Sequence, residues 1–239
     1  MKKLITLLLV FLSFTCTNSN NVIRQDEALK NKSVSEDIEW SNMWMVSVNK
    51  MDLPKVLIIG DSHVERYYPV VAGKLLDKAY CSKFTTSRSL GDPALIEQLK
   101  TIFFCYKFDA ICFNNGLHGI EYTDEEYSNY IPLVYELFNE SNPGLKLIWV
   151  NTTARRIQDN IAGFDEHNTG VVNRNLVVGN FTQAKNITLI DLYSMSISHP
   201  EYYENDGIHF NKDGVEEEAR CVSDEILKVI ENMNINMKR

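Results

Sequence analysis

The sequence predicts a three-layer α/β sandwich built around a parallel sheet of five strands. Two observations support this fold class. From residue 55 onward, short apolar runs alternate with helical patterns, which is typical of a parallel sheet covered by helices on both faces. The first run, residues 56–59, is uninterrupted, as expected for a strand that is buried on both sides.

The expected elements follow one another in a regular order. Acidic residues at 124–126 suit the positive start of one helix, and Pro93 suits the first turn of another. Pro69 is expected to kink the first helix or to shift its start. In such sheets the chemistry lies beyond the carboxyl ends of the strands. Strands are expected at 56–59, 83–86, 108–113, 145–150 and 187–191, and helices at 64–76, 93–103, 123–138, 170–184 and 213–232.

The composition indicates one globular domain behind an export signal. Of 239 residues, 44% are hydrophobic and 23% are charged, which favours a folded chain over a disordered one. A net charge of −8 with scattered Lys and Arg argues against a nucleic-acid partner. We expect an export signal over 1–16, a tether and lead-in over 17–53, and the domain over 54–239. The apolar stretch 4–14 is too short to span a bilayer but fits a secretory signal.

Cys16 follows that apolar stretch directly, which resembles a bacterial lipoprotein signal with lipid attached to this cysteine. An ordinary signal peptide cut elsewhere is the alternative, because Phe14 is unusual so close to a lipidated cysteine. The chain is thus expected to be exported, to the periplasm or the cell surface, and to meet a membrane only through this anchor. The export route would permit one disulfide bridge. The candidates are Cys81, Cys105, Cys112 and Cys221.

Ser62 is the candidate nucleophile. It lies in a Gly-Asp-Ser-His stretch (residues 60–63) directly after the first expected strand, where its N–H can face an oxyanion at the start of a helix. A serine hydroxyl needs a base, and His209 with Asp206 three residues earlier can supply the base and its orienting carboxylate. Taken singly, a helix cap and an Asp-Gly turn explain the same residues.

Two further stretches also follow expected strands. An amide from Asn114 or Asn115 could donate to the same oxyanion, and Gly91 could offer an unobstructed backbone N–H. An Asn-Gly turn and a loop glycine are the ordinary alternatives. Because all these stretches fall at one expected edge of the sheet, one site is favoured over separate coincidences.

Together these motifs resemble the SGNH/GDSL hydrolase superfamily over roughly residues 54–232. The resemblance rests on Gly-Asp-Ser near the N-terminus, a later Gly, a later Asn, and Asp-x-x-His before the last helix. It implies a flavodoxin-like α/β/α fold that needs neither a metal nor an organic cofactor. It implies Ser62 as nucleophile and oxyanion donor, His209 as general base and Asp206 as the residue that orients it, with Gly91 and an Asn completing the oxyanion hole.

The sequence departs from the usual family pattern at two places. His63 stands where the family usually has Leu, and its side chain is expected to line the pocket. The third block reads Asn-Asn-Gly-Leu-His in place of Gly-x-Asn-Asp, which resembles a subgroup and favours Asn114 over Asn115 as the donor. His118 and Arg155, with Arg156 as the alternative to Arg155, are weaker candidates for substrate contact.

The expected function is hydrolysis of an ester through an acyl-serine intermediate. The expected substrate is an O-acetylated carbohydrate, either a small molecule or a polysaccharide, or another small O-acyl ester. Two alternatives stay open: a catalytically silent carbohydrate-binding or scaffold lipoprotein, and an O-acyltransferase that uses the same triad.

Overall fold

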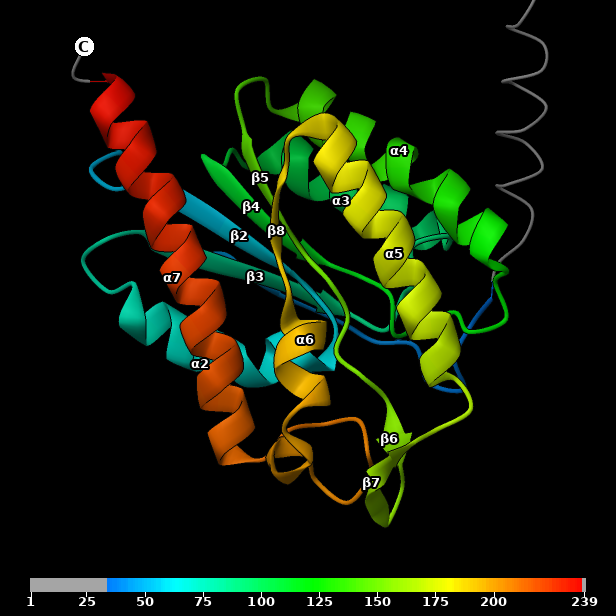
Figure 1. Cartoon of the computed structure of the whole chain (residues 1–239). Helices are drawn as coiled ribbons and strands as arrows, with labels where there is room; N and C mark the ends of the chain where they lie inside the picture. The colour runs from blue at the N-terminus through cyan, green and yellow to red at the C-terminus, as the bar shows by residue number, and fades with distance from the viewer. Residues whose placement is uncertain (1–33, 238–239) are drawn as a thin grey trace, which may run out of the picture. The chain divides into compact units, whose positions relative to one another are not determined.

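The computed structural model describes residues 34–237 (Figure 1). The expected export signal, Cys16 and the first part of the expected lead-in lie outside these residues. Within them, no helix is both long enough and apolar enough to cross a membrane.

A six-stranded sheet forms the centre of the fold, in the order β1-β3-β2-β4-β5-β8. Its last five strands are parallel, and their order is the flavodoxin-like one, so the predicted five-stranded parallel sheet is confirmed. They are β2 (Lys55–Gly60), β3 (Tyr80–Thr86), β4 (Ala110–Asn114), β5 (Lys146–Val150) and β8 (Thr188–Ile190).

The sixth strand comes from the lead-in and was not predicted. β1 (Ser41–Trp44) pairs antiparallel with β3 at the edge of the sheet, and all four of its residues are exposed. A short exposed strand has no apolar face, so it leaves no alternation in the sequence. Residues 41–44 of the lead-in therefore belong to the sheet.

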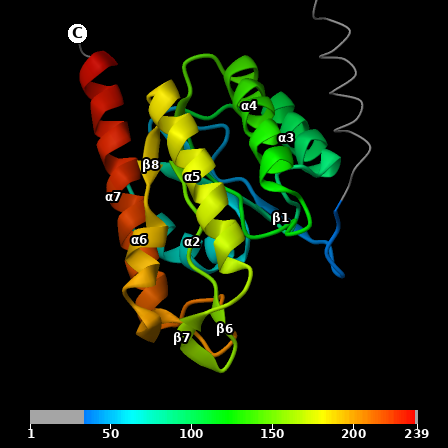
Figure 2. The same ribbon diagram turned by 45° about the vertical axis from the view of Figure 1, so that its right-hand side comes forward.

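Helices cover both faces of the sheet. On one face lie α2 (Ser62–Lys74) and α7 (Lys212–Met237), and on the other lie α3 (Pro93–Cys105), α4 (Asp124–Ser141) and α5 (Asn168–Lys185) (Figures 1 and 2). Alternating strand residues point to the two faces. Val56 and Ile58 join the core beneath α2 and α7, whereas Phe113 and Trp149 pack towards α4 and α5. The α/β/α layering is thus confirmed.

The helix ends follow local chemistry. Asp61 caps α2 by accepting the N–H of His63, so this helix begins at Ser62 and continues through Pro69. Thr123 and Glu126 form a capping box at the start of α4. The last helix begins at Lys212, close to its expected start.

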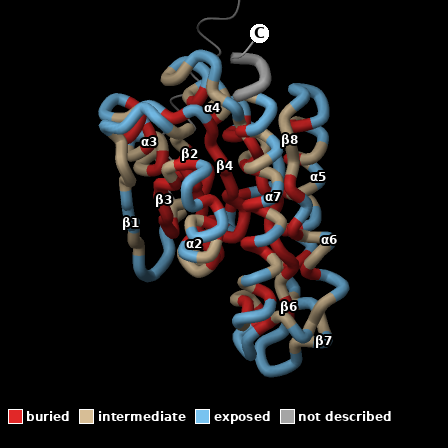
Figure 3. The backbone as a smooth tube through the Cα atoms, turned by 90° about the vertical axis from the view of Figure 1, so that its left-hand side faces the viewer, coloured by how far each residue is buried: buried red, intermediate tan, exposed pale blue. Residues whose placement is uncertain are grey.

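Four small elements near the carboxyl edge were not predicted. β6 (Arg156–Ile157) and β7 (Asn160–Phe164) form a hairpin, and α6 (Leu192–Ile197) and the 3₁₀ helix η1 (Pro200–Tyr202) follow β8. The hairpin projects from the end of the domain beyond the buried strands (Figure 3).

The four cysteines at positions 81, 105, 112 and 221 are free thiols in the structure. Cys112 and Cys81 are buried, and burial raises the pKa of the Cys81 thiol to about 12. Both behave as small core residues.

Candidate active site

The fold brings Ser62, His209 and Asp206 together at the carboxyl edge of the sheet. Ser62 is the first residue of α2 and directly follows β2 and the capping residue. His209 lies in the loop just before α7, 147 positions later in the chain, with its Nε2 atom 2.8 Å from Ser62 Oγ. The site therefore depends on packing between distant segments.

Asp206 orients the His209 ring. Its Oδ2 atom lies 2.6 Å from His209 Nδ1, and its Oδ1 atom accepts the N–H groups of Ile208 and His209 at 2.9 Å. Burial alone would raise the pKa of Asp206, but the hydrogen bonds from His209 and the backbone outweigh it and lower this pKa. An ionised Asp206 holds the proton on Nδ1, so Nε2 can accept the proton of Ser62.

The three side chains remain open to solvent. The His209 side chain is 25% exposed and that of Asp206 is 42% exposed, and Ser62 is half-buried. A small molecule or the end of a polymer can thus approach the hydroxyl. The arrangement is a hydrogen-bonded hydroxyl, imidazole and carboxylate that an outside reactant can reach.

The loop that carries Asp206 is held by the β6–β7 hairpin. Arg156 donates its N–H to Gly207 O at 2.8 Å, and Gly207 adopts a φ of +72° against the Arg156 backbone. The buried Arg156 guanidinium also donates to the carbonyls of Ser196 and Ile197, and it stacks on Tyr203. Together these contacts hold the loop that carries Asp206 in place. Sequence reasoning considered Arg156 only for contact with an anionic substrate, because nothing in its neighbourhood marks it as buried.

The two candidate asparagines point in opposite directions. The Asn114 amide donates both hydrogens to the end of β5, to Val150 O at 3.0 Å and Asn151 O at 3.1 Å. The Asn115 amide donates to Arg88 O at 2.9 Å. Arg88 follows β3 and Asn115 follows β4, and β2 lies between these strands, so this bond passes over the end of β2 where Ser62 begins. The choice between Asn114 and Asn115 as oxyanion donor stays a prediction, and the path of the Asn115 bond is the reason to consider Asn115 first.

Gly91 is packed closely between other groups. A Cβ atom at this position would lie 2.3 Å from the Tyr130 ring, so the site tolerates only glycine. Gly91 follows β3, which neighbours β2, so its backbone belongs to the same edge of the sheet as Ser62. Its role as an oxyanion donor stays a prediction.

The weaker candidates are engaged with protein groups. His63 is buried, and its Nδ1 atom lies 2.8 Å from Glu218 Oε1, so its ring turns inward and lines a small enclosed cavity. Arg155 pairs with Asp165 at 3.0 Å. Its expected contact with an anionic substrate therefore has no support in the geometry.

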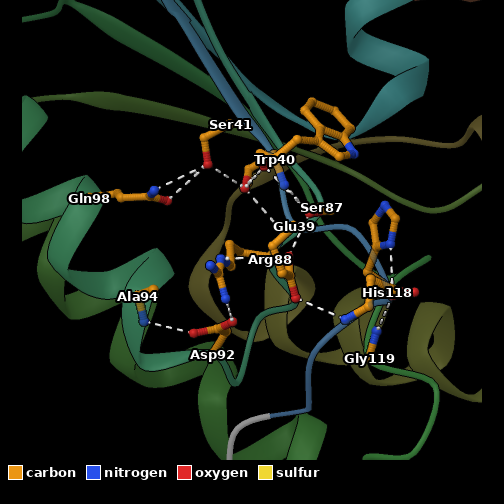
Figure 4. Close-up of polar contacts among 12 residues, drawn as sticks. Glu39, Trp40, Ser41, Ser87, Arg88, Asp92, Ala94, Gln98, His118 and Gly119 are labelled. Atoms are coloured by element: carbon orange, nitrogen blue, oxygen red, sulfur yellow. Dashed lines mark hydrogen bonds and ion pairs between the residues drawn. The ribbon is translucent and has the colours of Figure 1, made fainter.

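The lead-in passes along one side of the loops after β3 and β4 (Figure 4). Glu36 accepts from Gly119 N–H and lies 2.9 Å from His118 Nδ1. Glu39 accepts the hydroxyl of Ser87 at 2.6 Å and lies beside Arg88. His118 is thus tied to the lead-in, although its Nε2 atom has no protein partner within the described residues.

Arg174 organises the loop after β4, and sequence reasoning missed it. Its guanidinium is buried and donates to the carbonyls of Gly116, His118, Gly119 and Tyr122. A signal was present: Arg174 falls on the buried stripe of α5 between Val171 and Val178, where a charge is out of place unless it has partners. Across residues 34–237, no group of three or more His, Cys, Asp or Glu side chains could hold a metal ion.

Neither a family model nor a curated protein matches the sequence. Solved structures do match. An acetylxylan esterase from Geobacillus stearothermophilus has a TM-score of 0.60 at 14% identity, with 72% of this chain and 94% of that chain covered. A GDSL-like lipase from Bacteroides thetaiotaomicron has a TM-score of 0.60 at 12% identity, with 74% and 89% covered.

A further acetylxylan esterase structure has a TM-score of 0.62 at 14% identity, with coverage of 72% and 99%. Each alignment covers most of both chains, so the likeness concerns the whole domain rather than one motif. The identities are too low to carry more than the architecture. The chain has the α/β/α fold of the SGNH/GDSL hydrolases.

Proposed function

We propose that this protein is a serine ester hydrolase. The observation that carries the proposal is the continuous chain of hydrogen bonds from Ser62 Oγ through His209 to Asp206. These hydrogen bonds lie at the carboxyl edge of a fold shared with a GDSL-like lipase and with acetylxylan esterases. The fold alone permits many functions, so the proposal depends on the site.

In the proposed reaction, Ser62 Oγ attacks the ester carbonyl carbon while its proton passes to His209 Nε2. The tetrahedral oxyanion would accept hydrogen bonds from the N–H of Ser62, at the positive end of α2, and from the Asn115 amide and the N–H of Gly91. The bond to the alcohol oxygen then breaks, and His209 gives its proton to the leaving alcohol. Water next attacks the acyl-serine with His209 as base, which releases the acid and restores Ser62.

We further propose an O-acetylated carbohydrate as the substrate class. Two of the similar structures are acetylxylan esterases, and the exposed triad leaves room for a polymer to approach. Acetate release from acetylated glycans, measured beside hydrolysis of p-nitrophenyl esters of increasing chain length, tests this assignment. A preference for long acyl chains would contradict it.

The first prediction concerns Ser62→Ala. Because the serine and histidine act as a unit, this variant should lose at least about 10⁴-fold in kcat on p-nitrophenyl acetate. It should also lose labelling by a fluorophosphonate probe, which reacts with an activated serine. Ser223→Ala is the matched control, because Ser223 is buried in α7 and bonds within that helix. Equal rates for wild type and Ser62→Ala would rule out the proposed function.

A further inference from the structure

The distance between Ser62 and His209 depends on how two helices are placed. Ser62 is the first residue of α2, and His209 lies three residues before the start of α7. These helices pack side by side on one face of the sheet (Figure 3). A small shift of one helix along the other would move the nucleophile relative to its base.

A buried pair of ionisable side chains joins the same two helices next to the triad. His63 follows Ser62 directly, and its Nδ1 atom lies 2.8 Å from Glu218 Oε1 in α7. The Glu218 side chain is fully buried and that of His63 is 8% exposed. The His63 ring also contacts the residues around the base: its centroid lies 5.9 Å from the His209 ring and 5.3 Å from Phe210.

The electrostatics of the pair favour a protonated imidazole beside a carboxylate. Burial alone would lower the pKa of His63, but the buried Glu218 carboxylate outweighs it and raises this pKa to about 9. Burial raises the pKa of Glu218, and the proton on His63 opposes that rise.

Each member of the pair needs the other. Within the described residues, Glu218 Oε2 has no hydrogen-bond partner and lines a cavity of about 10 Å³ beneath the sheet edge. Loss of His63 would therefore leave a buried carboxylate without its cation, which is strongly unfavourable. Because each side chain requires the other as its partner, the pair fixes how α2 packs against α7.

Resting on the proposed serine mechanism, we propose that His63 and Glu218 are a positioning pair that locks α2 against α7 and so sets the Ser62–His209 contact. They do not touch the substrate. The pair should therefore affect the rate of acyl transfer and leave substrate binding unchanged. Simple packing is the rival explanation, and it predicts an effect on stability alone.

Glu218→Gln and the double variant H63L/E218L separate the two explanations. Glu218→Gln keeps the shape of the side chain but removes its charge. It should lower kcat about tenfold, because a small misplacement of reacting groups costs this much or more, and it should change KM by less than about twofold. The double variant replaces the pair by apolar groups, an exchange that is often neutral or stabilising, so it should fold. It should show a similar or larger loss of kcat.

Val71→Ala is the matched control, since Val71 is fully buried where α2 meets the same core but lies two turns from the triad. It should lose stability and keep kcat. Full kcat in a folded Glu218→Gln or in the double variant would overturn the positioning role. The rate of fluorophosphonate labelling of wild-type Ser62 tests the proposed function separately: a wild type without labelling fails as a serine hydrolase, whatever the pair does.

Discussion

At the scale of single residues, neighbouring asparagines have different tasks. Asn114 bonds to the end of β5, whereas Asn115 reaches across the end of β2 to Arg88. Motif comparison favoured Asn114, but it says nothing of which neighbouring strand each amide contacts. The difference lies in which strands flank β4.

Asn115→Ala should impair catalysis, and Asn114→Ala should impair stability. Loss of one oxyanion donor lowers kcat by roughly 100- to 1,000-fold, so we expect this for Asn115→Ala with little change in KM. Asn114→Ala removes two buried hydrogen bonds, at a cost of about 1–3 kcal/mol in the free energy of unfolding. Steady-state kinetics and urea denaturation of both variants check this. A larger loss of kcat in a folded Asn114→Ala would return the donor role to Asn114.

At the scale of elements, the short hairpin of β6 and β7 holds the catalytic loop in place. The turn that carries Asp206 and His209 accepts a hydrogen bond from the Arg156 N–H in β6, and its conformation requires the positive φ of Gly207. The sequence predicted β2, β4 and β5 well, because their buried runs are continuous. It missed β1, β6 and β7, which are short and partly exposed and owe their shape to pairing.

Gly207→Ala should displace the catalytic loop. A Cβ atom at this position would lie 2.2 Å from Arg156 O, so the turn must shift and Asp206 must move with it. We expect a loss of at least about 100-fold in kcat and of about 1–3 kcal/mol in stability. Gly179→Ala in α5 is the control: a Cβ there meets nothing within 4 Å, and alanine favours a helix, so this variant should be at least as stable as wild type. Equal kinetics for the two variants would contradict the role of the turn.

At the scale of the whole molecule, the sequence predicted where the site lies better than what supports it. The parallel strands all end at the same edge of the sheet, so the residues that follow β2, β3 and β4 lie close together there. The loop before α7, which carries Asp206 and His209, reaches the same edge. Glu218 and Arg174 both stand in helices, where a charge usually faces solvent. Arg174 left a signal in the buried stripe of α5, whereas the burial of Glu218 follows from how α7 packs on the sheet.

The buried pair should also make the stability of the molecule depend on pH. Because the pKa of His63 is raised to about 9 in the folded state, the stability it contributes is complete below its unfolded value near 6.5 and is lost as the pH rises through about 9. Asp61 and Glu218 face this imidazole and raise its pKa, and Arg66 lowers it. The His209 ring and the hydroxyl of Tyr67 also lie nearby.

We therefore expect the free energy of unfolding of the wild type to fall between pH 7 and pH 10, by up to about 3 kcal/mol. The H63L/E218L variant has neither group, so its stability should change less over this window, and other titrating groups cancel in the comparison. Urea denaturation of both proteins at intervals of one pH unit measures the difference. If the two curves of unfolding free energy against pH run parallel, His63 does not hold its proton in the folded chain. A neutral imidazole releases no proton as the pH rises, so it would give no such pH dependence.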